Sequence, residues 1–442
     1  MSATTIPDYG TLGERAAAGL KPKSLSDEQK IAKAKEAFLA GMTADMATYL
    51  ESCIHCGMCA EACHFYISTG DAKYTPIYKT EPLKKVYRRE LSSMRLFNRI
   101  TTRDITVQDL EDWKELAYDS CTQCGRCSLL CPMGIHIQSM IQVVRNGLAA
   151  AGMAPAELQA VSDEQKDKGS ILGAGSDKLR EVVERVRAKG VDVPLDKDKA
   201  DVLVLSSALD FLKDESVLEA TAKVMNKLGV NWTIRSDGFE SANFGALSGD
   251  RVAQKRISKR VIDAAIASGA KKVIVAECGH AYPVLRWEAA TNYGKELPFE
   301  ILSVAEYFGQ ELKAGRLKLK KAGNGASHVT FHDPCKLGRM GGSFSEARDI
   351  LSALGVKLSE MESHGRTNLC CGGGGGVSML KSALPLRQKA FELKRQEVER
   401  TGAPTVVTAC NTCFQTLEAG KAWLNWDKDI VNLVQLVSDN LA

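Results

Sequence analysis

The stretch 401-TGAPTVVTACNTC-413 joins a short β-strand pattern to a pair of cysteines. Residues 405–408 form an apolar, β-branched run that predicts a buried strand. Cys410 and Cys413 follow where that strand would end. Open parallel sheets bind their ligands at the carboxyl ends of strands. The stretch therefore predicts an α/β fold with a site at the edge of its sheet.

Strand and helix patterns alternate on both sides of this stretch, and the same order occurs twice. Alternating strands and helices predict parallel sheets covered by helices. The first set has strands at 201–207, 231–236 and 271–277 with helices at 213–229 and 256–269, and the second has strands at 328–334, 356–361 and 405–410 with helices at 345–355 and 384–402.

Offsets of 126 to 133 residues superpose the two sets. The segment 268-SGAKKVIVAEC-278 matches 401-TGAPTVVTAC-410 with one residue of slippage. Self-similarity of this kind predicts two related α/β halves.

Five cysteines distinguish the second half from the first. These are Cys335, Cys370, Cys371, Cys410 and Cys413, and the matching positions of the first half are Ala208, Asn243, Phe244, Cys278 and Ala281. A metal site can be lost from one copy while its fold remains, whereas a folding requirement would keep the cysteines in both. The five thiols therefore predict a metal site. They exceed the four that zinc or an ordinary cubane takes.

The segment 368-NLCCGGGGGVSML-380 places two adjacent thiols before five glycines. Glycine supplies the positive φ that lets neighbouring cysteines reach one inorganic core, so Gly372 and Gly373 are candidates to approach a bound group. The alternative is a flexible linker. His332, Lys336 and Arg339 could tune the site, or they could be a strand-end histidine and surface cations.

Cys278 has two interpretations as well. It is a relic of a lost site, which we favour, or a buried small hydrophobe.

Two ferredoxin-type motifs precede the α/β halves, 53-CIHCGMCAEAC-63 and 121-CTQCGRCSLLCP-132. In such pairs three thiolates of one motif and the fourth of the other hold each [4Fe-4S] cubane. The predicted ligand sets are Cys53, Cys56, Cys59 and Cys131 for one cubane, and Cys121, Cys124, Cys127 and Cys63 for the other. Zinc is the alternative, but four thiols within eleven residues would crowd a tetrahedral ion.

The 57 residues between the motifs have helical spacing, so we expect an all-helical ferredoxin domain. Ser26 and Gln29 form a predicted capping box for a helix that runs towards Leu50. His64 stands where a proline usually follows the fourth cysteine.

Composition limits the classes of function. The chain has 442 residues, 44% hydrophobic, with 14 cysteines and a formal charge of +4. Its start lacks the pattern of a signal peptide, which predicts a cytoplasmic protein with metal-binding thiols. This charge gives no support to nucleic-acid binding. No G-x-G-x-x-G follows a strand, so we expect no flavin or NAD in this chain.

These patterns predict an α+α/β multidomain chain, with an all-helical ferredoxin-like domain followed by two repeated α/β halves. The expected parts are an N-terminal helical extension at 1–45, the ferredoxin-type domain at 46–153, a linker with one amphipathic helix at 154–200, a degenerate half at 201–326 and the five-cysteine half at 327–442.

The spacing C-x34-CC-x38-C-x2-C at 335–413 resembles the CCG domain of the heterodisulfide reductases. Its fusion behind two ferredoxin motifs resembles the D subunit of that enzyme and the related DsrK protein of the sulfite reduction-associated DsrMKJOP complex. This resemblance implies that the five cysteines hold a catalytic non-cubane [4Fe-4S] cluster, where a disulfide or persulfide is reduced or formed. Two cubanes would pass electrons to or from it.

The resemblance also implies partners. They are an electron-transfer subunit, either a membrane b-type cytochrome or a soluble flavoprotein, and a thiol or disulfide substrate such as a small sulfur-carrier protein. A cytochrome partner would hold the chain at the membrane periphery. The alternative is the iron–sulfur relay subunit of a glycolate, lactate or glycerol-3-phosphate dehydrogenase, which passes electrons to quinone. Sequence leaves the direction, the thiol, the potentials and the oligomeric state open.

Overall fold

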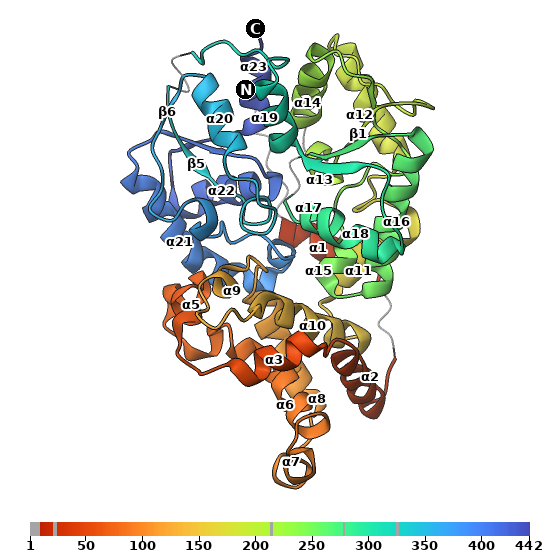
Figure 1. The fold of residues 1–442 in the computed structure, drawn as a ribbon, viewed down its shortest axis with the longest axis vertical. Coiled ribbons are helices and arrows are strands. Elements are labelled where there is room, and N and C mark those ends of the chain that lie inside the picture. Colours follow the sequence, from red (N-terminus) through yellow and green to blue (C-terminus); the bar gives the residue numbers. More distant parts are fainter. Residues whose placement is uncertain (1–8, 21–23, 213–214, 277–278, 324–326) are drawn as a thin grey trace.

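A helical N-terminal region carries two α/β halves that lie side by side, as predicted (Figure 1). The computed structural model describes residues 9–20, 24–212, 215–276, 279–323 and 327–442. No helix in those ranges is long and apolar enough to cross a membrane.

The helical region is built from short helices around one central helix. Its elements are α1 (Tyr9–Ala17), α2 (Asp27–Ala40), α3 (Ala44–Ser52), α4 (Met58–Glu61), α5 (His64–Thr69), α6 (Glu81–Glu90), α7 (Arg95–Thr101), α8 (Val107–Lys114), the π-helical turn η3 (Glu115–Asp119), α9 (Arg126–Leu129) and α10 (Ile137–Ala150). Helix α10 is the core of this region, because ten of its fourteen residues are buried.

The predicted capping box is present at the start of α2, where Ser26 and Gln29 exchange hydrogen bonds. The expectation of one helix running to Leu50 is wrong, because α2 ends at Ala40 with Gly41 as its C-cap, and α3 begins at Ala44. A β-carbon on Gly41 would lie 2.4 Å from Cγ1 of Val143 in α10, so the chain turns where it touches the central helix.

Each half contains a four-stranded parallel sheet. The first consists of β1 (Val202–Leu205), β2 (Trp232–Thr233), β3 (Lys272–Val275) and β4 (Glu300–Ser303), and the second of β5 (His328–His332), β6 (Lys357–Leu358), β7 (Thr405–Thr408) and β8 (Asp429–Asn432). The strand orders are β2-β1-β3-β4 and β6-β5-β7-β8, so the two halves share one topology. The predicted repeat is therefore confirmed at the level of the fold.

Helices cover both sheets and connect their strands. Those of the first half are α13 (Ala208–Phe211), α14 (Ser216–Lys227), α15 (Phe244–Ser248), α16 (Arg251–Ser268), α17 (Ala281–Pro283), the π-helical turn η4 (Val284–Glu288), α18 (Ala289–Tyr293) and α19 (Val304–Lys313). Those of the second are α20 (Glu346–Ala353), α21 (Leu384–Arg400), α22 (Asn411–Leu424) and α23 (Leu433–Asp439). The halves pack through α14 against α23 and α19 against α20.

Strand pairing shifts one predicted correspondence by a residue. Val202 pairs with Lys272 in the first half, and Val329 pairs with Thr405 in the second. Ala208 corresponds to Cys335 when Val202 corresponds to Val329, and Lys272 then corresponds to Thr405. On this register the first-half residue equivalent to Cys413 is His280, and not Ala281. Cys278 lies outside the described residues.

The segment 154–200 contains two helices where the sequence predicted one, α11 (Ala156–Lys168) and α12 (Ser176–Ala188). Helix α11 was not predicted because it has few apolar residues. Leu158 and Val161 are its only buried hydrophobic residues. It packs against α1, α15 and α16, so it joins the helical region to the first half. The domain limits themselves remain predictions.

One buried arginine joins all three parts of the chain. Arg145 of α10 has no exposed surface, and its guanidinium lies 4.7 Å from the ring centre of Tyr118. Its nitrogens donate hydrogen bonds of 2.7 to 3.0 Å to four backbone carbonyl oxygens, those of Ala117 and Cys121 in the helical region, Leu247 in the first half and Gly375 in the second. The planar fork of an arginine suits this arrangement, because it presents five donors in fixed directions.

We expect Arg145→Met to lower the free energy of unfolding by about 3 kcal/mol or more, because four buried carbonyl oxygens lose their charged donor. Thermal unfolding of the anaerobically prepared protein measures the change. Arg88→Met is the matched control, since Arg88 is exposed at the surface of α6. An equal melting temperature for both variants would contradict this role of Arg145.

Candidate metal centre

The five cysteines of the second half meet in one buried cluster. Cys335, Cys370, Cys371, Cys410 and Cys413 are 2 to 7% exposed and pack against one another. The sulfur atoms of Cys371 and Cys413 lie 3.4 Å apart. Five thiols from three separate loops thus converge at the carboxyl edge of the second sheet, as the sequence predicted.

The strand ends determine where these thiols lie. Cys335 follows β5, Cys410 follows β7, and Cys413 occupies the first turn of α22. The loop after β5 is held by Asp333, whose carboxylate makes two 2.9 Å hydrogen bonds with Arg348. Burial opposes ionisation of Asp333, but these bonds outweigh it and hold its pKa below the usual value.

His332 lies beside the thiols, with ring and sulfur atoms of His332, Cys371 and Cys413 within 4.8 Å of one another. Neither ring nitrogen has a hydrogen-bond partner within the described part of the chain. A buried imidazole without a partner is costly, and an inorganic core with sulfur acceptors would satisfy it. The donor set and this orphaned ring therefore fit a metal–sulfur group.

The glycine run folds tightly and touches the ferredoxin loop. Gly372 has φ of 90° and donates its N–H to the sulfur of Cys370 at 3.4 Å. A β-carbon on Gly375 would lie 2.6 Å from the carbonyl carbon of Thr122. On Gly373 it would meet the hydroxyl of Thr416 at 1.9 Å. The glycines therefore permit close approach of backbones from two parts of the chain.

The two predicted cubane ligand sets line two separate cavities. One cavity is lined by Cys53, Cys56, Cys59 and Cys131, and the other by Cys63, Cys121, Cys124 and Cys127. The first lies closer to solvent, since Cys56 is exposed. Burial raises the pKa of the Cys59 and Cys63 thiols, and metal coordination is the interaction that deprotonates such thiols.

The second of these cavities adjoins the five-cysteine cluster. Cys124 packs against the five thiols, and its interaction with the thiol of Cys370 lowers the pKa of Cys124. Arg339 fixes this junction, because it donates to the carbonyl oxygen of Cys124 at 3.1 Å and to Oδ1 of Asn368 at 2.8 Å. Arg339, predicted as a tuning residue, thus contacts backbone next to two candidate ligands.

His64, the residue that replaces the usual proline, is buried at the same junction. Burial lowers its pKa to about 4, although the nearby Cys124 opposes the shift, so the ring is neutral at pH 7. Its Nε2 atom has no hydrogen-bond partner among the described residues. It is a second buried nitrogen whose surroundings fit a metal–sulfur group.

The first half forms the opposite wall of the five-cysteine cavity. Leu209, Phe244, Leu247, Gly279 and His280 line it, together with Tyr9 of α1. A β-carbon on Gly279 would lie 2.9 Å from the sulfur of Cys410. These wall residues could not be predicted as part of a site, because their types carry no metal-ligand pattern. Only the histidine in 277-ECGHAYP-283 offered a signal.

A pair of buried carboxyls lies behind this wall. Asp210 accepts a hydrogen bond from the side chain of Asn411, which follows Cys410. Glu240 accepts from the backbone N–H of Ala208 at 2.9 Å. Burial raises the pKa of Asp210 to about 6 and that of Glu240 to about 7.

A groove of about 550 Å³ adjoins the five-cysteine cavity. His280 and Lys336 line both the groove and the five-cysteine cavity. Burial lowers the pKa of Lys336, and burial with the nearby Lys336 lowers that of His280 to about 4. Three more cations line the groove, Arg251, Arg339 and Arg366. These cations outnumber Glu288, the acid among the described residues of the groove, so the arrangement favours an anionic ligand there.

Comparison with known proteins defines the class of the chain. Residues 49–135 match the 4Fe-4S dicluster domain, and residues 329–418 match the cysteine-rich domain called CCG. The chain is therefore a CCG-domain iron–sulfur protein, with a dicluster domain that binds two 4Fe-4S cubanes. The cysteines and histidine of the CCG domain indicate an additional metal or iron–sulfur site.

The relatives narrow this class. Over 410 residues the chain is 27% identical to the D subunit of the dihydromethanophenazine:CoB–CoM heterodisulfide reductase of Methanosarcina barkeri, with 90% of this chain and 96% of that protein covered. It is 23% identical to the Hdr-like menaquinol oxidoreductase iron–sulfur subunit of Archaeoglobus profundus, covering 82% and 74%. It is 25% identical to the EtfAB:quinone oxidoreductase of Syntrophomonas wolfei, covering 84% and 55%. The chain is thus homologous to the D subunit of heterodisulfide reductase and resembles the Hdr-like subunits, as the sequence predicted.

We expect Gly375→Ala to separate the glycine run from the ferredoxin loop, because the added methyl group would overlap the backbone of Thr122. Gly372→Ala is the matched control, since Gly372 also has positive φ but has no atom within 4 Å of an added β-carbon. Both positions have positive φ, at 90° for Gly372 and 66° for Gly375, but only Gly375→Ala adds a clash with Thr122. Only that variant should therefore expose the cysteines. Alkylation of the metal-free, reduced protein measures that exposure. Equal reactivity in both variants would show that the contact with Thr122 is unimportant.

Glu240 should make stability depend on pH. Its folded-state pKa of about 7 exceeds the ordinary 4.5, so folding takes up a proton between these values. Stability is therefore greatest at the acid end of this window, falls as pH rises through it, and levels off above about pH 7, a loss of up to about 3 kcal/mol. Between about pH 6 and 8 the melting temperature of the wild type should fall more than that of Glu240→Gln.

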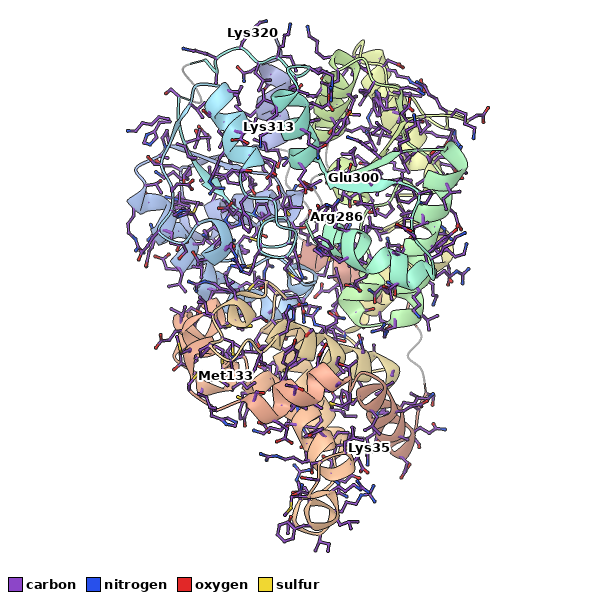
Figure 2. All side chains as sticks on the ribbon, viewed as in Figure 1. Lys35, Met133, Arg286, Glu300, Lys313 and Lys320 are labelled. Atoms are coloured by element: carbon purple, nitrogen blue, oxygen red, sulfur yellow. The ribbon has the colours of Figure 1, made fainter. Side chains whose placement is uncertain are left out.

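The matched control is Glu300→Gln, which removes an exposed carboxyl labelled in Figure 2. The melting temperature of this variant should change with pH as that of the wild type does. Parallel curves for wild type and Glu240→Gln would contradict the raised pKa.

Proposed function

We propose that this chain is the iron–sulfur subunit of a heterodisulfide reductase-like complex, in which the five-cysteine site reduces or forms a disulfide or persulfide. The observation that carries the proposal is the contact between Cys124 and Cys370. It joins the second cubane ligand set to five buried thiols, whose cavity shares His280 and Lys336 with the groove.

The reaction sets what the chain has to provide. Reduction of RSSR′ to RSH and R′SH consumes two electrons and two protons, with cleavage of the S–S bond. When bound, the two cubanes would each carry one electron at a time, and a non-cubane [4Fe-4S] group on Cys335, Cys370, Cys371, Cys410 and Cys413 would supply the sulfur chemistry. The ligand sets proposed for the cubanes are those that line the two ferredoxin cavities.

The protein residues supply position, access and protons. The wall of the first half, with Phe244, Leu247 and Gly279, keeps water away from the thiols. Lys336 lines both cavity and groove, where its Nζ can donate a proton to a sulfur anion. His280 holds its ring in the same passage, with Nε2 accepting from the backbone N–H of Asn243 at 3.2 Å.

The proposed partners follow from two features of the chain, the exposed Cys56 at the first cubane cavity and the cationic groove beside the five-cysteine cavity. Electrons would enter or leave through a partner subunit, a membrane b-type cytochrome or a soluble flavoprotein, at the exposed Cys56 end. A thiol or disulfide, free or on a small sulfur-carrier protein, would use the cationic groove. The chain itself would be cytoplasmic, at the membrane through its partner.

A second candidate is an electron relay towards quinone without substrate sulfur. It is favoured by the similarity to the EtfAB:quinone oxidoreductase. A relay subunit of a glycolate, lactate or glycerol-3-phosphate dehydrogenase would act in the same way. The two candidates differ in whether a thiol or disulfide changes the spectrum of the isolated chain.

The test is EPR spectroscopy of the anaerobically purified protein, oxidised with and without candidate thiols. We expect a thiol-dependent signal that Cys371→Ser lacks, because Cys371 lies 3.4 Å from Cys413 in the centre of the thiol cluster. Both cubane signals should persist in the variant, since the cubane cavities have other linings. Viologen-dependent disulfide reduction should fall at least about a hundredfold.

Thr412→Ser is the matched control, because Thr412 lines the same cavity and the change keeps all thiols. It should retain the thiol-dependent signal. A Cys371→Ser protein with wild-type disulfide turnover would refute sulfur chemistry at this site. Cubane signals without any response to thiols or disulfides in the wild type would favour the relay.

A further inference from the structure

An arm projects from the helical region, away from both α/β halves (Figure 1). It consists of α6, α7 and α8, with α7 at its far end. The arm is an insertion between the two ferredoxin motifs, and its residues are not among those that line the two cubane cavities. The arm therefore contributes no residue to the walls of either cubane cavity.

Large apolar side chains are exposed at the end of the arm. Within residues 91–101, which we call the tip, Leu91 is 46% exposed, Met94 59%, Leu96 72%, Phe97 59% and Ile100 87%. Single exposed hydrophobic residues are ordinary, but five within eleven consecutive residues form a patch that marks an interaction site.

The tip is held in this orientation by polar contacts on its inner side. Asn98 donates to the carbonyl oxygen of Arg88 at 2.9 Å and to the hydroxyl of Ser92 at 3.1 Å. Arg89 reaches the carbonyl oxygens of Arg99 and Thr102. These hydrogen bonds hold the polar side of the tip against the arm, so the apolar side chains face solvent.

The base of the arm is tied down as well. Arg103 and Lys85 both bind Asp109, at 2.7 and 2.9 Å. Lys35 of α2 binds Asp104 at 2.8 Å. The tip is thus presented on a braced support.

Cations surround the apolar patch. Residues 88–103 contain five arginines and a single acid, Glu90. Arg88 and Arg95 are exposed, and neither forms an ion pair with any residue that the structure describes. On α7, Leu96, Phe97 and Ile100 share one side of the helix, and Arg95 and Arg99 flank them.

We propose that the tip inserts into the interface of a lipid bilayer with anionic headgroups. Apolar side chains flanked by arginines are the pattern of interfacial anchors, in which the rings and aliphatic chains enter the acyl boundary and the cations stay at the phosphates. A stable protein interface needs about 20 to 30 residues on each side, far more than the eleven of the tip. A lipid surface requires only the few side chains that the tip offers.

The proposal is tested on the full, cluster-loaded chain with no other subunit. Co-sedimentation is measured with vesicles of phosphatidylcholine alone and with vesicles containing about 30% phosphatidylglycerol. We expect the partition coefficient to be at least about tenfold higher on the anionic vesicles and to fall with added salt.

Two variants separate the contribution of the apolar side chains to vesicle binding from that of the arginines. Leu96→Ser/Phe97→Ser/Ile100→Ser should lower binding to anionic vesicles at least about tenfold. Arg88→Ser/Arg95→Ser should lower it to a similar degree and remove most of the salt dependence. Both should keep the cubane EPR signals, which shows that they fold.

Lys318→Ser/Lys320→Ser is the matched charge control, because it removes two exposed cations from the opposite end of the molecule, where Lys320 is labelled in Figure 2. It should bind like the wild type. Equal binding to both kinds of vesicle, or wild-type binding by the tip variants, would overturn the proposal. Loss of association with a membrane subunit in the tip variants, without vesicle binding by the wild type, would also overturn it and assign the tip to a protein.

Discussion

The buried guanidinium of Arg145 is the contact on which the arrangement of the three parts depends. A charged group without exposed surface is stable only where its donors are satisfied, and the four acceptors come from the helical region and both α/β halves. Two of these acceptors, on Cys121 and Gly375, belong to the loops that carry candidate ligands. The same residue therefore sets the distance between the ferredoxin loop and the glycine run.

Duplication of the α/β half separates architecture from chemistry within one molecule. Both sheets have the same strand order, but the thiols gather at only one of them. The other half forms one wall of the five-cysteine cavity, where Gly279 lies against Cys410. His280 of the same half lines both this cavity and the groove. A half without the cysteine cluster thus still shapes the site of the other half.

Much of the fold and the cysteine clusters could be predicted from the sequence, because strand periodicity, helix caps and cysteine spacing are local signals. The strands β4 and β8 were missed, since each has only two apolar residues, flanked by polar residues that are not β-branched. The helix α11 was missed because a polar helix carries little periodicity. The contribution of Tyr9 to the cavity and the contact between Cys124 and Cys370 join residues more than 200 positions apart. Such contacts follow from the packing of whole domains, which no local pattern encodes.

The contact of Gly375 with Thr122 has a consequence for the maturation of the protein. Once the ferredoxin loop has closed over the glycine run, the five thiols are almost inaccessible, with at most 7% of any of them exposed. A metal–sulfur group on these thiols would therefore have to be inserted while the helical region and the second half are still apart. The order in which the parts dock would then decide whether the site can be filled.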